Sequence, residues 1–160
     1  MARAYIGLGS NIGDRRAALE EAARRLETDA GRIAARSSLY RADPVEVVDQ
    51  EEFLNQVVGL DSALEAADLL GQCLAIERAM GRVRTRDKGP RVIDLDLLLY
   101  DDVILEGPGL EVPHPRLHLR RFALAPLAEI APGLRHPRLR LTIAELLARC
   151  PDVSRVEPVG

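Results

Sequence analysis

The chain has 160 residues, enough for one domain with a substantial core, and its 47% hydrophobic and 29% charged residues are ordinary for a soluble globular protein. The formal net charge of −3 gives the whole molecule no attraction for a polyanion, and the scarcity of aromatic residues, 3% with no Trp, argues against a nucleic-acid module built on base stacking. Two cysteines, Cys73 and Cys150, cannot make a disulfide framework, so we expect a reducing compartment.

The first residues, MARAYIGLGSN, lack the charged and apolar regions of a signal peptide, and no apolar run reaches about 18 residues. We therefore expect a cytoplasmic protein with no membrane partner. No composition break or internal repeat divides the chain, so we expect a single domain over residues 1–160. We expect a monomer, because no leftover apolar stripe is evident.

Hydrophobic periodicity predicts a series of strands and helices. In chain order these are a strand over 2–10, a helix over 15–28 with Asp14 as N-cap, strands over 31–42 and 53–62, and a helix over 64–80 stopped by Gly81. A strand over 92–102 follows, with a hairpin partner over 103–107. The rest is an irregular segment over 108–120, short helices over 121–130 and 141–150, and a loosely held tail over 151–160. The order β-α-β-β-α-β is the ferredoxin-like split βαβ plan. It predicts an α+β fold, with helices packed on one face of a mostly antiparallel sheet and a C-terminal helical extension.

Two carboxylates interrupt the apolar strand VIDLDLLLY. Strand alternation places Asp94 and Asp96 on one face, roughly 7 Å apart, while Ile93, Leu95, Leu97 and Leu99 face the helices. Two neighbouring carboxylates repel each other unless a cation neutralises them. Mg²⁺ is suited to such a pair, because it binds one or two protein carboxylates together with phosphate oxygens and water.

A basic segment, GRVRTRDKGPR, comes directly before this strand and contains Arg82, Arg84, Arg86, Lys88 and Arg91. Together with the acids it suggests a phosphoryl-transfer site that lacks a P-loop, in which arginines neutralise phosphate charge. The alternative is an internal ion-pair network of the two aspartates with Arg82 and Arg91.

Several motifs in register resemble the family of 6-hydroxymethyl-dihydropterin pyrophosphokinases, enzymes of folate biosynthesis. The motifs are DKGPRVIDLDLL, GLGSNIGD, SSLYRADP, FLNQVV, GRVR, VPHPRL and RRFALAPLAEIAP, which span about residues 3–150. The resemblance implies the ferredoxin-like fold and the transfer of a pyrophosphoryl group from ATP to the pterin's hydroxymethyl oxygen, with release of AMP.

The resemblance also implies site residues. Asp94 and Asp96 would bind two Mg²⁺ ions, and Arg82 and Arg91 would act with them in catalysis. The implied ATP-binding residues are Arg82, Arg84, Arg91, Leu97, Glu111, His114 and Arg120. The implied pterin-binding residues are Ala42, Pro44, Val45, Phe53, Asn55, Asp94 and Phe122.

The residues of the implied pterin site make sense chemically. Phe53 and Phe122 are the only two Phe in the chain, and a flat heterocycle needs two ring faces. The Asn55 amide can both donate and accept, as a pterin edge requires. Plain core packing is the competing interpretation of either Phe.

Two other functions compete with this one. A two-metal phosphodiesterase or nuclease could use the aspartate pair, but it would need more carboxylate or His ligands on the same face. A regulatory small-molecule-binding module could share the fold, but it offers no reason for the aspartates and arginines.

Overall fold

The structure is a computed structural model that describes residues 1–43, 52–81 and 92–159. Its main sheet has six strands, and the strands follow the order β5-β1-β4-β3-β8, with β2 also paired to β4. The strands are β1 (Ala2–Ser10), β2 (Arg32–Arg36), β3 (Tyr40–Ala42), β4 (Phe53–Ser62), β5 (Asp94–Tyr100) and β8 (Val156–Pro158). Every pairing is antiparallel, and the order is that of the split βαβ plan, so the predicted fold class is confirmed.

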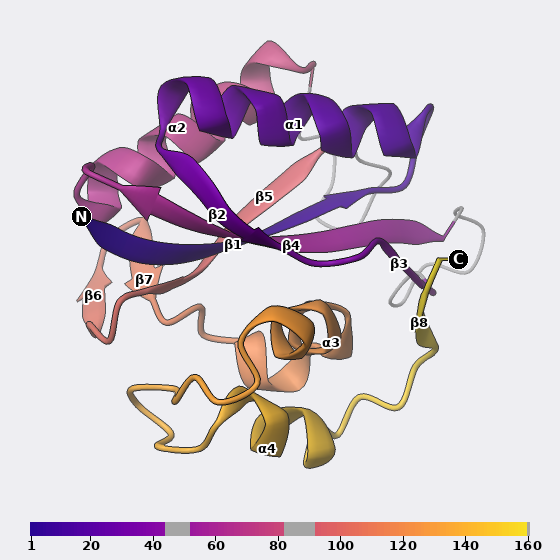
Figure 1. The fold of residues 1–160 in the computed structure, drawn as a ribbon, viewed down its shortest axis with the longest axis vertical. Helices are drawn as coiled ribbons and strands as arrows, with labels where there is room; N and C mark the ends of the chain where they lie inside the picture. The colour runs from indigo at the N-terminus through magenta and orange to yellow at the C-terminus, as the bar shows by residue number, and fades with distance from the viewer. Residues whose placement is uncertain (44–51, 82–91, 160) are drawn as a thin grey trace.

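Helices cover both faces of this sheet (Figure 1). The predicted pair, α1 (Arg15–Asp29) and α2 (Ala66–Ala79), lies on one face, and the C-terminal helices α3 (Arg121–Ile130) and α4 (Ile143–Ala148) lie on the other. As predicted, Asp14 caps α1 by accepting a hydrogen bond from the Ala17 amide at 3.1 Å. Gly81, with φ +87°, follows the C-cap of α2.

Each face of the sheet has its own core. Ile6, Val58 and Leu97 pack with α1 and α2, whereas Tyr5, Val57 and Leu98 pack with α3 and α4. Neighbouring residues of one strand thus enter opposite cores, as strand alternation requires.

The predicted strand over 31–42 is wrong in one respect, because the structure divides it into β2 and β3. Ser37 interrupts it: its Oγ accepts the Val57 amide hydrogen at 3.0 Å, and its carbonyl accepts from Gln56 Nε2 at 2.8 Å. A side chain therefore takes the place of part of the backbone ladder.

The predicted facing of β5 is wrong beyond Leu97. Tyr5 and Ile6 pair with Leu99 and Leu97, so Leu98 is an extra residue in the ladder. Such a bulge inverts the alternation that follows it. Leu99 therefore packs in the core under α3 and α4, and Tyr100 packs against the core under α1 and α2.

Two further predictions are corrected. The segment over 103–107 does not pair with β5; its strand β6 (Leu105–Gly107) pairs with β7 (Leu110–Val112), within the segment that was expected to be irregular. That segment also contains the short helix η1 (Leu117–Leu119). The tail is not loose, because β8 pairs with β3 and Val159 donates to the Leu39 carbonyl at 2.9 Å.

Candidate active site

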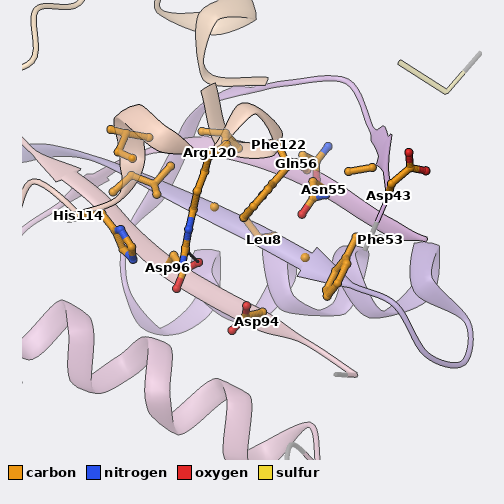
Figure 2. Close-up of a pocket in the computed structure, with 17 residues that line it drawn as sticks. Leu8, Asp43, Phe53, Asn55, Gln56, Asp94, Asp96, His114, Arg120 and Phe122 are labelled. Atoms are coloured by element: carbon orange, nitrogen blue, oxygen red, sulfur yellow. Dashed lines mark ion pairs between the residues drawn. The ribbon is translucent and has the colours of Figure 1, made fainter. Parts of the chain in front are cut away.

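The carboxylate strand separates two cavities. The first, of about 110 Å³, lies on the face of the sheet that α3 covers, and Figure 2 shows the side chains that line it. It is lined by Gly7, Leu8, Gly9, Ala42, Asp43, Phe53, Asn55, Gln56, Val57, Asp94, Asp96, Leu98, His114, Leu117, Arg120, Phe122 and Ala123. The predicted residues of the pterin site that the structure describes all lie on this cavity.

The second cavity is larger, about 590 Å³, and lies between α2, β5 and the β6–β7 hairpin. It is lined by Leu70, Leu74, Glu77, Asp94, Leu95, Asp96, Leu97, Gly107, Gly109, Leu110, Glu111, Val112, His114, Pro115 and Arg120. The predicted ATP-binding residues Leu97, Glu111, His114 and Arg120 are among them. Four residues line both cavities, namely Asp94, Asp96, His114 and Arg120.

The two aspartates lie at this junction because β5 projects both from one face. In the ladder, Asp94 is opposite Gly9 and Asp96 is opposite Gly7. Glycine has no side chain, so the neighbouring strand leaves the space over both carboxylates open. Nη1 of Arg120 lies 3.9 Å from Oδ2 of Asp96, and both side chains are 31% exposed. A metal or phosphate group can therefore reach these charges.

The carboxylates of Asp94 and Asp96 suit Mg²⁺ better than they suit a metal ion whose ligands all come from the protein. Within the described ranges 1–43, 52–81 and 92–159, no group of three or more His, Cys, Asp or Glu side chains could hold a metal ion. Mg²⁺ commonly takes only one or two protein carboxylates and completes its octahedron with phosphate oxygens and water. Asp94 and Asp96 meet that pattern.

His114 presents a neutral imidazole at the junction. Burial, together with the charges of Arg120 and Arg116, lowers the pKa of His114 to about 4, and the charge of Asp94 partly opposes this shift. Nδ1 of His114 accepts the Arg116 amide hydrogen at 3.1 Å, so in the neutral ring Nε2 carries the proton. The side chain is thus a hydrogen-bond donor that adds no charge.

Two phenylalanine rings and a buried amide line the first cavity. Phe53 and Phe122 come from β4 and α3, and the Arg120 guanidinium lies over the Phe122 ring at 5.6 Å from its centroid. Asn55 is only 6% exposed, and its Nδ2 is buried without a hydrogen-bond partner. A buried amide with an unused donor is costly unless a ligand supplies an acceptor. The Asn55 amide is therefore available to a ligand that carries a hydrogen-bond acceptor.

Gly9 allows the amide to occupy that position. A Cβ at residue 9 would lie 2.8 Å from Oδ1 of Asn55 and 3.6 Å from Cδ1 of Phe53. The close approach of β1 therefore requires glycine here.

Part of the predicted site lies outside the described residues. Arg82, Arg84, Arg91, Pro44 and Val45 fall in 44–51 and 82–91, so their assignments stay predictions. The ion-pair alternative for Arg82 and Arg91 is untested for the same reason.

Sequence reasoning missed other lining residues. Glu77 is 3% exposed and lines the second cavity, and its Oε2 accepts the amide hydrogen of Leu95, between the two aspartates, at 2.7 Å. One feature of the sequence could have indicated Glu77, namely a charged residue directly after Ile76, on the buried side of α2. Leu98 and Leu117 line the first cavity, but nothing distinguishes them in sequence from core residues.

The described helices include none with the length and apolar character needed to cross a lipid bilayer.

Comparison with known proteins identifies the family. The model of the 7,8-dihydro-6-hydroxymethylpterin-pyrophosphokinase family matches residues 5–132. The chain belongs to this family. A Methylorubrum extorquens 2-amino-4-hydroxy-6-hydroxymethyldihydropteridine pyrophosphokinase is 50% identical over 135 residues, which are 84% of this chain and 85% of that protein. The Pseudomonas aeruginosa protein of the same name is 46% identical over 153 residues, 93% of this chain and 92% of its own length.

The pyrophosphokinase also resembles one portion of larger proteins. It is 40% identical over 150 residues to the Schizosaccharomyces pombe folic acid synthesis protein fol1, covering 93% of this chain and 20% of that one. A solved structure described as HPPK-DHPS in complex with substrates superposes with a TM-score of 0.75 at 15% identity, over 92% of this chain and 43% of that one. At that identity the likeness supports the fold alone.

Membership decides between the functions left open by the sequence. The chain is an ATP-using pyrophosphokinase of folate synthesis, that is, a transferase, rather than a nuclease or a non-catalytic module.

Proposed function

We propose that the enzyme transfers the pyrophosphoryl group of ATP to the hydroxymethyl oxygen of 6-hydroxymethyl-7,8-dihydropterin at the junction of its two cavities. The pterin occupies the first cavity and ATP the second. The observation that best supports this proposal is that Asp94, Asp96, His114 and Arg120 line both cavities. A group that is transferred between two substrates must pass where their two binding sites meet.

The bond changes define what the site must do. The hydroxymethyl group loses its proton to water, and its oxygen forms a bond to the β-phosphorus. The bond from that phosphorus to the α,β-bridging oxygen breaks, and AMP departs with the electron pair. Positioning of the two substrates and neutralisation of phosphate charge are the contributions that the protein makes.

Each residue has a proposed task. Phe53 and Phe122 stack on the pterin ring, Asn55 pairs with its edge, and Ala42, Pro44 and Val45 contact it through the main chain. His114 donates from Nε2 to a phosphate oxygen, and Arg120 neutralises phosphate charge. Arg82, Arg84 and Arg91 contact the phosphates, and Leu97 and Glu111 lie along the adenine.

Asp94 and Asp96 are proposed to hold two Mg²⁺ ions between the cavities. Bound there, Mg²⁺ supplies charge neutralisation at the triphosphate and at the departing AMP. Support comes from the glycines opposite both carboxylates, which leave room over them.

The enzyme is also proposed to be a single domain over 1–160, because both cores share β1, β4 and β5. Its cytoplasmic location and monomeric state remain predictions.

The direct test mixes the enzyme with ATP, Mg²⁺ and 6-hydroxymethyl-dihydropterin and measures AMP. We expect AMP that depends on both pterin and metal, and we expect Asp96→Ala to abolish turnover while pterin still binds. Formation of ADP would mean attack at the γ-phosphorus. Normal turnover by Asp96→Ala would refute the metal assignment.

A further inference from the structure

The C-terminal segment runs beside one wall of the first cavity. In Figure 1, β8 lies along β3 at the edge of the sheet. The ladder pairs Tyr40 with Pro158 and Ala42 with Val156, and it continues to a hydrogen bond from the Asp43 amide to the Arg155 carbonyl at 3.3 Å. Backbone pairing therefore brings residue 155 next to residue 43, which lines the cavity.

The side chain of Arg155 joins two separate parts of the chain. Its Nη2 lies 2.9 Å from Oδ1 of Asp43 and 2.6 Å from Oε2 of Glu52, and its Nη1 lies 3.1 Å from Oε1 of Glu157. Arg15, at the start of α1, donates from Nη1 to the Glu52 carbonyl at 2.7 Å. Arg15 of α1 thus holds the backbone carbonyl of Glu52, and Arg155 of the C-terminal segment holds its carboxylate.

Both joined residues adjoin the cavity that the pterin is proposed to occupy. Ala42 and Asp43 line it directly, and Glu52 immediately precedes Phe53, which lines it as well. Ala42 and Phe53 are partners in the β3–β4 ladder. The carboxylates of Asp43 and Glu52 repel each other unless a cation stands between them, and the Arg155 guanidinium takes that place.

We propose that Arg155 is a positioning residue for the pterin subsite, which holds Asp43 and Glu52 together and so fixes the Ala42–Phe53 wall. This inference rests on the proposed function, because it takes the first cavity as the place of the pterin. Arg155 does not line either cavity, so it acts through Asp43 and Glu52 rather than on the substrate.

The effect of Arg155 should appear in pterin affinity rather than in overall stability. Its side chain is 43% exposed, and ion pairs at that exposure contribute little to folding. The residues it joins are absent from the lining of the second cavity, so binding of ATP should not depend on them.

The experiment compares KM for the pterin, KM for ATP and kcat in two variants and a control. Arg155→Gln removes the charge and leaves the β8 backbone pairing intact, whereas Arg155→Lys keeps the charge without the guanidinium fork. The control is Arg36→Gln, because Arg36 pairs with Glu20 at 2.8 Å at a similar exposure, 34%, away from both cavities.

We expect Arg155→Gln to raise the pterin KM about threefold to tenfold, with the ATP KM unchanged, and Arg155→Lys to recover part of that loss. Arg36→Gln should change none of the constants. An unchanged pterin KM, or an equal rise for both substrates, would overturn the positioning role.

Phe53→Ala, assayed in parallel, separates this inference from the proposed function. If Phe53→Ala weakens pterin binding and Arg155→Gln does not, only the positioning role fails. If Phe53→Ala leaves the pterin KM unchanged, the assignment of the cavity fails, and the role of Arg155 fails with it.

Discussion

At the scale of single residues, the site depends on where side chains are missing as much as on where they are present. Gly7 and Gly9 lie opposite the two aspartates, and both line the first cavity. The amino-acid sequence alone does not distinguish the two glycines. The structure distinguishes them, because a Cβ at Gly7 would make an ordinary contact with Leu98 at 3.5 Å, whereas at Gly9 it would overlap Asn55 at 2.8 Å.

Gly9→Ala should therefore weaken pterin binding much more than Gly7→Ala does. The added methyl must displace the Asn55 amide, and misplacing one polar contact of this kind costs about tenfold in affinity or more. The pterin dissociation constant, measured by titration calorimetry for both variants, checks this prediction. Gly7→Ala is the matched control from the same strand and cavity, and equal losses in the two variants would contradict the argument.

At the scale of elements, α3 is tied to the sheet by one carboxylate. Glu129 accepts hydrogen bonds from the Tyr40 hydroxyl at 2.7 Å, the Ser38 amide at 3.0 Å and the Ser38 hydroxyl at 3.1 Å. Burial raises the pKa of Glu129, but the hydrogen bonds from Tyr40 and Ser38 outweigh burial and hold the pKa below its ordinary value. Helix α3 carries Phe122, so this contact also fixes one wall of the first cavity relative to β3.

Glu129→Gln should destabilise the enzyme at neutral pH by about 0.5–1 kcal/mol, since the hydrogen bonds are to a charged but exposed acceptor. Because the folded-state pKa is depressed, the unfolded state binds more protons in acid. The contribution is present above the ordinary pKa of glutamate and is lost as the pH falls through the folded-state value.

Urea unfolding of wild type and Glu129→Gln at pH 7 and at about pH 3 tests this sign, and the difference between them should shrink in acid. Tyr40→Phe should be measured alone and combined with Glu129→Gln. The loss of unfolding free energy in the double variant should be smaller than the sum of the losses in the two single variants. A deficit independent of pH would show that the carboxylate charge plays no part.

Elements whose patterns are local could be predicted from the sequence, and elements that depend on distant partners could not. The bounds of β1, β4 and α3 agree with their predicted ranges, because alternation or helical periodicity is uninterrupted in each. The break at Ser37 depends on hydrogen bonds with β4, and the formation of β8 depends on its pairing with β3, which is more than 100 residues away in the chain. The bulge at Leu98 comes from a register shift against β1, which a run of leucines does not reveal.

The candidate site follows the same division. Asp94, Asp96, Phe53, Asn55 and Phe122 were predicted because their residue types are unusual where they stand or match family motifs. Glu77 and Arg155 were missed because their roles depend on contacts across 18 and 112 residues of chain, with Leu95 and Asp43.

At the scale of the whole molecule, one sheet supports two cores, and this arrangement places the two cavities on either side of β5. The core under α1 and α2 underlies the second cavity, which is proposed to bind ATP, whereas the core under α3 and α4 borders the first cavity, which is proposed to bind the pterin. Each of β1, β4 and β5 contributes side chains to both cores, as Ile6 and Tyr5 do from β1. Neither core can therefore lose its strands without exposing the other.

The two cores should accordingly unfold in one cooperative transition. Leu69 and Leu124 are fully buried in the first and second core, and replacing either with Ala removes contacts and leaves a cavity that costs about 2–5 kcal/mol. Scanning calorimetry of Leu69→Ala and Leu124→Ala should show one peak at a lowered midpoint in both variants, with the calorimetric enthalpy equal to the van't Hoff enthalpy. Two peaks in Leu124→Ala would mean that α3 and α4 melt from the sheet separately. In that case Phe122 would leave the first cavity and Arg120 would leave the junction before the sheet unfolds, and the proposed pterin binding would be lost at the first peak.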